Sequence, residues 1–467
     1  MATIKSKLEL PLKDALRNYD IFPKVVVAGR ETEITVKPLG WHSAFQANVC
    51  HNVALCPLDE GQRWEYPERN NKHALEVTPD ADGCIRFCFR FFGEQEFYVR
   101  INDGGSFKLQ LSVFCVAEDL AGRYPFRGDL HMHTRRSDGK QAPAIVAANY
   151  RKTGYDFTVI SDHRRYYPSL EAIDAYKDVP TEFTIVEGEE VHLPKGGIGR
   201  SNDVHIVNFG GSYSINALVE GSENEKERGS DPSVRSTIPN PPPVRSEEAF
   251  FTEIESYADT LVIPEGIERF TYACCHWTFN EIKKGGGLGI FCHPYWLSNV
   301  LQVPPAFVDY MMETHPFGAF EVLGGENYFE QNGFQTLQYY EDRAKGRRYP
   351  IVGSTDSHNS CNARNSHICS TIVFAPENTR ESLVRSIEEF YSVAVDTISD
   401  EPRFVGEMRF VRYACFLENE YYALHDELCF EEGRAMKDYI CGVEGAKETL
   451  AFLHGRMKAQ REKYFAF

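Results

Sequence analysis

The sequence lacks the segments that would direct it to a membrane or to an oxidising compartment. It has no apolar run near the roughly 18 residues of a membrane-spanning helix. The N-terminal segment MATIKSKLELPLKDALRNYD has no apolar core of signal-peptide length. The 13 cysteines are scattered without a CxxC pair, which in 467 residues indicates reduced thiols rather than a disulfide framework. We therefore expect a cytoplasmic protein without a membrane partner.

Basic residues are also in deficit. Lys and Arg number 50 against 68 Asp and Glu, so the net charge is -18 at pH 7. Such a field repels a nucleic-acid backbone, and we expect no nucleic-acid polymer as a partner. A small anion is not excluded, because a pocket can be locally positive on an acidic protein. The length allows two or three domains, each with a substantial core.

Three regions differ in their residue pattern. Residues 1–124 alternate apolar and polar positions and are rich in β-branched and aromatic residues, which predicts a β-sandwich-like domain built of hairpins. In 125–375, short apolar runs alternate with amphipathic segments, as parallel strands do with helical crossovers. Residues 376–467 predict a mainly helical C-terminal extension that packs on the second domain.

Seven apolar runs mark the strands expected in 125–375. They lie near Leu130 and at 156–160, 183–187, 204–209, 288–292, 318–323 and 348–353. Seven runs fit a seven-stranded α/β barrel better than an eight-stranded one. Residues 212–246 interrupt this rhythm with a charged, Pro-rich stretch, which predicts a polar surface insertion.

The first chemical signal is the segment GDLHMHTRRSDGK at 128–140. His131 and His133 are two residues apart, so on a strand both side chains project from one face. The loop that follows can bring Asp138 toward them. Imidazole nitrogen and carboxylate oxygen together suit zinc, manganese or iron.

Further histidines and carboxylates follow later strand candidates. They are His163, Glu190, His205, His293, Asp356 and His358. Each alone is explained as well by a helix cap or an incidental polar side chain. Functional groups of α/β barrels cluster at the carboxyl ends of the strands, so the repetition favours one shared site.

The motifs HMH with SDG, SDH, GEEV, CHP and TDSH, in this order over about residues 126–375, resemble those of the PHP (polymerase and histidinol phosphatase) superfamily. They are most similar to those of its stand-alone phosphoesterases. The resemblance implies an α/β fold with a distorted (β/α)7 barrel and two to three divalent metal ions, zinc, manganese or iron. It implies one ion on His131, His133, Glu190 and Asp356, a second on Glu190, His205 and His293, and a third on Asp138, His163 and His358. Among these ligands, we assign catalytic roles to Asp138, His163, Glu190 and His358.

The resemblance is incomplete around GEEV. Where the family has Pro-Gly before its glutamate, this chain has Glu187–Gly188. Glu189 therefore competes with Glu190 for the bridging role, although strand register favours Glu190. His192 would lie on the same face of the strand as Glu190. It is a candidate to hydrogen-bond a metal ligand without contacting the ion itself.

The implied reaction is hydrolysis by water that metal ions activate. In agreement, the sequence has no GxSxG elbow and no Walker-type glycine loop. Cys292 lies in an apolar run, where core packing is favoured over a role as ligand or nucleophile. Five arginines follow the motifs: Arg135, Arg136, Arg164, Arg165 and Arg364. Each could be an ordinary solvated residue, but as a group they suit an anionic substrate.

We therefore predict a metal-dependent phosphoesterase that acts on a small phosphate monoester or a nucleotide-type substrate. Two alternatives stay open. The same site could hydrolyse a non-phosphate ester or a carbamate, as amidohydrolases do, or the chain could be a non-catalytic metal-binding scaffold. The complete ligand set argues against the scaffold, because decayed sites lose ligands.

Overall fold

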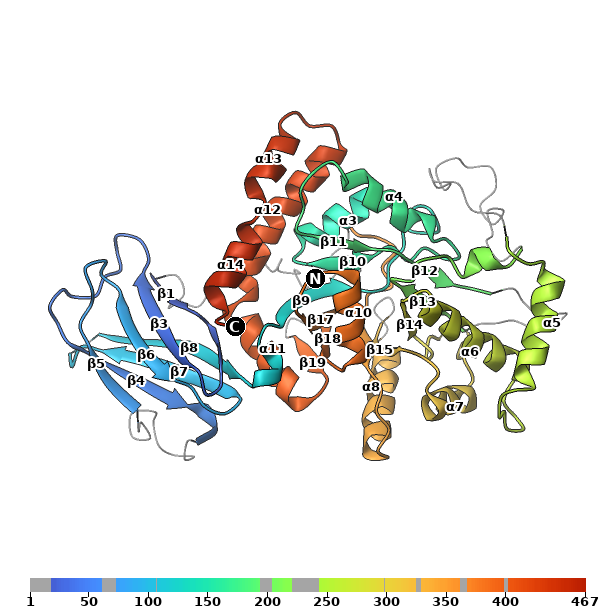
Figure 1. The fold of residues 1–467 in the computed structure, drawn as a ribbon, viewed down its shortest axis with the longest axis horizontal. Coiled ribbons are helices and arrows are strands. Elements are labelled where there is room, and N and C mark those ends of the chain that lie inside the picture. Colours follow the sequence, from blue (N-terminus) through green and yellow to red (C-terminus); the bar gives the residue numbers. More distant parts are fainter. Residues whose placement is uncertain are drawn as a thin grey trace. The chain divides into compact units, whose positions relative to one another are not determined.

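The computed structural model describes residues 18–60, 73–105, 107–193, 204–220, 243–297, 299–324, 329–361, 368–398 and 402–467. They form two compact units (Figure 1). The metal-ligand candidates all belong to the first unit, Tyr124–Glu407 with Cys429–His454. The second unit contains the described residues of Lys5–Arg123, Met408–Leu428 and Gly455–Phe467. The C-terminal part of the chain is thus divided between both units, which differs from the single extension expected from residue 376 onward.

The second unit is built on two sheets. The smaller is antiparallel, with the order β1 (Tyr19–Phe22), β3 (Glu31–Pro38), β6 (Ile85–Arg90). The larger has the order β2 (Val25–Val27), β8 (Lys108–Val116), β7 (Gln95–Asn102), β4 (His51–Pro57), β5 (His73–Val77). Every second residue of β7 is buried, as a strand with one face on a core requires. One hydrophobic cluster draws on both sheets, for example on Ile34 of β3 and Val99 of β7.

C-terminal segments complete this second unit. They include α11 (Met408–Glu420) and α14 (Arg456–Tyr464). The guanidinium of Arg409 donates hydrogen bonds to the carboxylate of Glu94 and to that of Asp119, at 2.7–2.8 Å. Beyond α14, Phe465 forms a parallel bridge with Val25 of β2. Segments as far apart in the sequence as Asp119 and Arg409, which are 290 positions apart, therefore belong to one compact unit.

In the first unit, all seven predicted apolar runs form strands. They are β9 (Tyr124–Asp129), β10 (Phe157–Val159), β11 (Thr184–Val186), β13 (Ile206–Phe209), β14 (Leu288–Phe291), β15 (Ala319–Leu323) and β16 (Ile351–Gly353). The remaining strands are β12 (Gly188–Val191), β17 (Cys369–Ala375), β18 (Ser392–Asp396) and β19 (Arg403–Val405). Residues 392–396 and 403–405 are therefore strands within the region that was expected to be mainly helical.

These strands form two sheets rather than one continuous ring of ladders. Their orders are β11-β10-β9-β17-β18-β19 and β12-β13-β14-β15-β16. Parallel pairs join β9, β10 and β11 in one sheet and β14, β15 and β16 in the other, and the remaining pairs are antiparallel. Two isolated bridges, Met132–Ser357 and His163–Glu190, connect the sheets; Glu190 lies within β12, and the other three residues lie beyond strand ends. Both bridges involve or adjoin the predicted ligands.

Helices connect most of the strands, as the alternating pattern predicted. They are α3 (Pro143–Lys152), α4 (Tyr167–Tyr176), α5 (Glu247–Ala258), α6 (Arg269–Lys284), α7 (Pro305–Thr314), α8 (Phe329–Ala344) and α10 (Arg380–Glu388). Local capping fixes where several begin: the hydroxyl of Ser246 accepts from the Ala249 amide at the start of α5, and Thr379 caps α10 in the same way. No described helix is both long and apolar enough to cross a bilayer.

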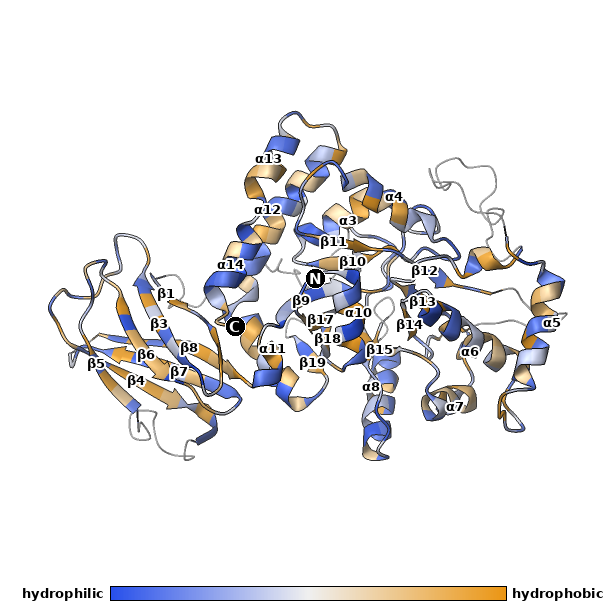
Figure 2. Cartoon of the chain, viewed as in Figure 1, coloured by the Kyte–Doolittle hydropathy of each residue, from blue (hydrophilic) through white to orange (hydrophobic). Residues whose placement is uncertain are grey.

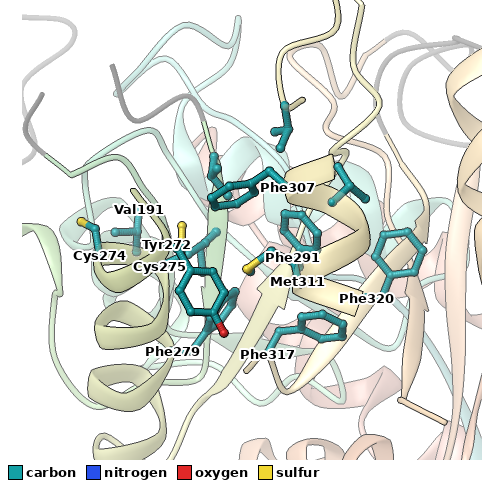
Figure 3. Packing of buried hydrophobic residues seen from close by; sticks show 14 of the residues in the cluster. Val191, Tyr272, Cys274, Cys275, Phe279, Phe291, Phe307, Met311, Phe317 and Phe320 are labelled. Atoms are coloured by element: carbon teal, nitrogen blue, oxygen red, sulfur yellow. The ribbon is translucent and has the colours of Figure 1, made fainter. Parts of the chain in front are cut away.

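An aromatic core packs α6 and α7 against β14 and β15 (Figure 3). The residues that meet there include Tyr272, Cys275, Phe279, Phe291, Phe307, Met311, Phe317 and Phe320. Because β14 and β15 are buried along their whole length, their carboxyl ends are held firmly where the ligands follow.

The first unit also contains α13 (Ala446–Leu453) and the part of α12 (Tyr422–Ile440) that begins at Cys429. Both helices alternate apolar and polar segments in Figure 2. Ala435, Met436 and Leu450 join the core under α3 and α4. Arg151 of α3 is fully buried and donates to Glu432 at 2.5 Å and to Asp156 at 3.2 Å. A buried cation with two carboxylate partners anchors this helix to the sheet.

The predicted insertion at 212–246 is not polar throughout. Ile215 and Val219, next to the short 3-10 helix Asn216–Leu218, are buried, whereas residues 221–242 lie outside the described part of the chain. The buried beginning of the insertion contributes to the site described next.

Candidate metal centre

Most of the predicted ligands lie at the carboxyl ends of the strands or in the loops beyond them, and His205 lies at the amino end of β13, which is antiparallel to β12 and β14. His131 and His133 follow β9, and His163 follows β10. Glu190 lies in β12, His205 immediately precedes β13, and His293 follows β14. Asp356 and His358 follow β16, and Asp138 lies in the loop after β9. Side chains up to 227 positions apart in the sequence thereby enter one cluster.

Glu190 is the centre of this cluster, and its two carboxylate oxygens face different histidines. Toward Oε2 point His131 Nε2 at 3.4 Å, His133 Nε2 at 3.4 Å and His163 Nδ1 at 2.5 Å. Toward Oε1 point His205 Nδ1 at 2.7 Å, His192 Nε2 at 3.4 Å and His293 Nε2 at 3.5 Å. This is the arrangement expected of a carboxylate that bridges two cations.

Asp356 completes the group on the Oε2 side. Its Oδ1 lies 2.8 Å from His133 Nε2 and 3.4 Å from His131 Nε2. Ligand atoms of His131, His133, Glu190 and Asp356 all lie within 4.8 Å of one another, close enough to share an ion. The structure thus brings together the first predicted ligand set.

Asp138 is the centre of a neighbouring group. Its Oδ1 lies 3.2 Å from His358 Nε2, and its Oδ2 lies 3.4 Å from His163 Nε2. The structure adds His133 to this group, since its ring stacks on both His163 and His358 with centroids 4.1 and 4.3 Å away. His133 therefore lies between the first and third predicted sets.

The second predicted set, Glu190, His205 and His293, meets at Glu190 Oε1. Cys292 comes near the same place, and its thiol could reach an ion together with His131, Glu190 and His293. Cys292 is also part of the hydrophobic core, and burial raises the pKa of its thiol well above the usual value. Both interpretations of this cysteine therefore have a structural basis.

The donor atoms in the cluster fit a cation. Both oxygens of Glu190, His131 Nε2 and His205 Nδ1 are buried, yet they have no hydrogen-bond partner among the described residues. Buried polar atoms in proteins are normally hydrogen-bonded, so a group of orphaned acceptors aimed at one another indicates a missing positive charge. The residues present thus match divalent metal ions.

The pKa shifts in the cluster also favour a bound cation. Burial alone would raise the pKa of Glu190, but the surrounding imidazoles, led by His163, lower it well below the usual value. Burial opposes charge on His163, yet Glu190 and Asp138 outweigh it and raise the pKa of this imidazole to about 10. His133 differs, because burial and its histidine neighbours lower its pKa to about 3. The carboxylates thus favour positive charge at their centre, and His133 supplies a neutral donor.

Glu189, the competitor for the bridging role, faces away from the histidines. Its carboxylate accepts from the Ser214 hydroxyl at 2.8 Å and from the Ile215 amide at 2.5 Å. Burial raises its pKa to about 7 against these hydrogen bonds. Successive residues of a strand point to opposite sides, which is why register selects Glu190.

Three further buried carboxylates hold the ligand-bearing loops. Asp129 accepts from the backbone of His131 and from Thr355, and Asp162 accepts from Thr134 and Ser137. Glu321 of β15 is fully buried and lies 3.0 Å from His131 Nδ1. Sequence reasoning did not single out Glu321. The available signal was one acidic residue in the apolar run GAFEVL, because unpaired carboxylates are rarely buried.

The backbone is strained at the site. His293, Asp356 and Arg164 have φ of 28°, 49° and 60°, in the left-handed region that non-glycine residues rarely adopt. Such conformations cost about 1 kcal/mol or more each and occur preferentially at functional sites.

The predicted arginines lie in different surroundings. Arg136 is paired with Glu171 at 2.6 Å, and Arg165 is buried and donates to the Arg136 carbonyl. Arg135 is exposed, and the half-buried Arg164 donates its amide to the Glu190 carbonyl at 2.8 Å. Arg364 lies outside the described residues.

The chain is similar to one curated protein and to several solved structures. No protein-family model matches the chain. It is 25% identical over 228 residues to the DNA polymerase/3'-5' exonuclease PolX of Bacillus subtilis (strain 168), covering 42% of this chain and 38% of PolX. The chain thus spans well under half the length of this curated relative.

Two solved structures are similar at low identity. A two-domain protein of Bacteroides vulgatus ATCC 8482, containing a predicted PHP-like metal-dependent phosphoesterase, is 15% identical with a TM-score of 0.35; 58% of this chain and 65% of that one are covered. An inferred metal-dependent phosphoesterase of Bifidobacterium adolescentis ATCC 15703 is 16% identical with a TM-score of 0.32; 56% and 94% are covered.

These similarities are low in identity and partial in coverage, so the superfamily resemblance rests on the ordered ligand motifs. The residues of these motifs converge on Glu190. The ligand motifs HMH with SDG, SDH, GEEV, CHP and TDSH resemble those of the PHP superfamily.

Proposed function

We propose that the protein is a metal-dependent phosphoesterase that hydrolyses a small phosphate monoester or a nucleotide-type substrate. The observation that carries this proposal is the position of Glu190, whose two orphaned oxygens each face three imidazole nitrogens. In this proposal, the ions are held by the three ligand sets that the motifs implied, and they are two or three in number, zinc, manganese or iron.

The bound ions would supply Lewis acidity and a water molecule of lowered pKa. The chain's own residues hold that chemistry in place. Glu190 keeps two ligand sets at a fixed separation, and Asp138, His163 and His358 form the third wall of the site. His358 and Asp138 are partly exposed, whereas His131 is fully buried, so substrate approaches from the side of Asp138. These four residues, Asp138, His163, Glu190 and His358, are the proposed catalytic group.

The proposed substrate is anionic because arginines border the same side. Arg135 and Arg164 are the best placed, since both are at least partly exposed and lie within two residues of a proposed ligand, His133 or His163. Arg165 and Arg364 stay in the proposal as substrate-binding residues. A planar guanidinium can bind two phosphate oxygens at once.

The test is a substrate panel with the full chain loaded with zinc or manganese. Nucleotides, sugar phosphates and histidinol phosphate form one arm, and aryl esters with carbamates form the second. Single-stranded DNA forms a third arm, because PolX carries the name of an exonuclease. We expect turnover in the first arm. Turnover confined to the second arm would make the protein an amidohydrolase-like enzyme, and none in any arm would favour the scaffold.

The matched variants are Asp356→Asn and His133→Ala. Each removes a donor of the first set while the protein stays folded, so we expect turnover to be abolished. His454→Gln is the control, because His454 is exposed at the end of α13. Full activity in Asp356→Asn would show that the proposed ligand map is wrong.

We also propose that the strands of 125–375 close into a distorted (β/α)7 barrel and that the two N-terminal sheets form a β-sandwich. Support comes from the bridges that join the sheets of the first unit and from the cluster that the N-terminal sheets share. A cytoplasmic location remains part of the proposal, supported by 13 cysteines without a CxxC pair.

A further inference from the structure

Three imidazole nitrogens surround Glu190 Oε1, and the family resemblance accounts for only two of them. Those two are His205 Nδ1 at 2.7 Å and His293 Nε2 at 3.5 Å. The third is His192 Nε2 at 3.4 Å. His192 is two residues beyond Glu190, so it leaves the strand on the same face.

The position of His192 is fixed by neighbours that are not ligands. Asn216, which is fully buried, accepts from the His192 amide at 3.1 Å and donates to its carbonyl at 2.7 Å. The imidazole stacks on His205, with ring centroids 3.9 Å apart and planes inclined by 29°. Its side chain is only 15% exposed, so the ring is held inside the site. Preorganisation of this kind is typical of residues that contact a ligand directly.

Two of the distances to Glu190 Oε1 match those between ligands of four-coordinate zinc. Donors about 2.0–2.1 Å from a tetrahedral ion lie about 3.3–3.4 Å from one another. The distances from Glu190 Oε1 to His192 and His293 agree with this edge length, whereas His205 Nδ1 lies closer, at 2.7 Å. We propose that His192 is a direct ligand, and that it completes a four-ligand cation site with Glu190, His205 and His293. The inference rests on the metal-dependent function proposed above.

A simpler role for His192 would be to orient His163, whose Nδ1 lies 3.1 Å from His192 Nε2. However, Glu190 Oε2 lies nearer to His163 Nδ1, at 2.5 Å. His192 is therefore not the nearest neighbour of His163 Nδ1, and orienting His163 would leave the 3.4 Å approach of His192 Nε2 to Glu190 Oε1 unexplained. The direct role explains more of the geometry.

A fourth protein ligand determines which of the proposed ions can be catalytic. Structural zinc sites have four protein ligands, and catalytic ones keep a position open. The ion at Glu190 Oε1 is then a structural one. Open positions are left to the ligand sets around Asp356 and Asp138.

The test measures metal binding without any substrate, so it is independent of whether phosphate esters are hydrolysed. The metal-depleted full chain is titrated with zinc, and bound zinc is counted after gel filtration. Wild type and His454→Gln should bind the same number of ions. His192→Gln should lower the affinity for one zinc ion by more than the 10–100-fold typical of a residue that only hydrogen-bonds a metal ligand. His205→Gln should lower the affinity for the same ion. Cobalt substitution should show the loss of one strongly absorbing four-coordinate site in His192→Gln.

Wild-type zinc affinity and an unchanged cobalt spectrum in His192→Gln would overturn the proposal and leave His192 with the role of orienting His163. If His192→Gln does not fold, the wild-type chain still decides. Diethyl pyrocarbonate modifies accessible imidazole nitrogens, and bound zinc should protect His192 as fully as His205, read by peptide mass spectrometry. Modification of His192 at the same rate with and without zinc would also overturn it.

Discussion

Glu321 and His131 form a buried pair in which Glu321 Oε2 lies 3.0 Å from His131 Nδ1. The other oxygen, Oε1, accepts from the backbone amide of His293 at 3.2 Å. One carboxylate thus holds two ligand-bearing segments. With the Nδ1 proton of His131 donated to Glu321, Nε2 is left as the donor that faces Glu190 and Asp356.

The first prediction concerns this pair. Glu321→Gln keeps the size of the side chain but removes its charge, so it weakens the control of the His131 tautomer. We expect zinc affinity to fall about 10–100-fold, because outer partners of metal-bound histidines have effects of this size. Competition titration with a fluorescent chelator measures it. Glu330→Gln on the exposed part of α8 is the matched control, and equal affinity in both variants would refute the pairing role.

The second prediction concerns Gly324, because a side chain at this position would displace the carboxylate of Glu321. A Cβ on Gly324 would lie 1.9 Å from Glu321 Oε1, too close for either atom to stay in place. Gly324→Ala should therefore displace Glu321, weaken zinc binding as Glu321→Gln does, and destabilise the protein by about 1–3 kcal/mol. Gly333→Ala is the control, because nothing lies within 4 Å of its Cβ and it sits in α8. The control should be neutral or stabilising by about 0.5–1 kcal/mol in urea unfolding.

The contrast between Glu321 and the strand-end ligands shows how far a sequence can predict this site. His131 and His133 were predictable because their spacing fixes a common face, and because carboxyl strand ends gather at one edge. Glu321 lies inside a strand, and only the pairing of β15 with β14 brings it under His131 and His293. Long-range pairing of this kind leaves no local signal.

The C-terminal region shows the same limit. Residues 392–396 were included in a mainly helical extension, yet they form β18, whose first four residues are buried. This strand pairs with β17 in antiparallel register, from Cys369–Asp396 to Val373–Ser392. A short apolar run after an amphipathic helix can be a strand or a helix end, and tertiary pairing decides between them.

The third prediction is that metal removal destabilises the protein. The orphaned oxygens of Glu190 and the anionic Asp356 repel each other when no cation lies between them. Each ion should add about 4 kcal/mol when free metal exceeds its Kd about 1,000-fold. Differential scanning calorimetry of the chelated and zinc-reloaded chain should therefore show a Tm that rises with zinc concentration. A Tm insensitive to chelation would contradict a metal site at Glu190.

The fourth prediction concerns the arginines at the open side of the site. If Arg135 and Arg164 bind substrate phosphate, then Arg135→Gln and Arg164→Gln should each raise KM for an anionic substrate about tenfold, with kcat largely kept. The reason is that one hydrogen bond to a charged group contributes about 1.5 kcal/mol at a partly exposed position. Arg136→Gln should act differently, because Arg136 is paired with Glu171. Losing that pair should lower stability slightly rather than raise KM.

The control for this series is Arg412→Gln in the second unit, where Arg412 pairs with Asp59 at 2.5 Å. It removes the same charge from the chain without touching the site, so KM should stay at the wild-type value. Steady-state kinetics at two salt concentrations separates direct contact from long-range steering, because only steering is lost as salt screens the charges. An unchanged KM in the double variant Arg135→Gln/Arg164→Gln at both salt concentrations would remove these arginines from the substrate site. Since the chain carries a net charge of -18, an anion would then have to be held by the metal ions alone.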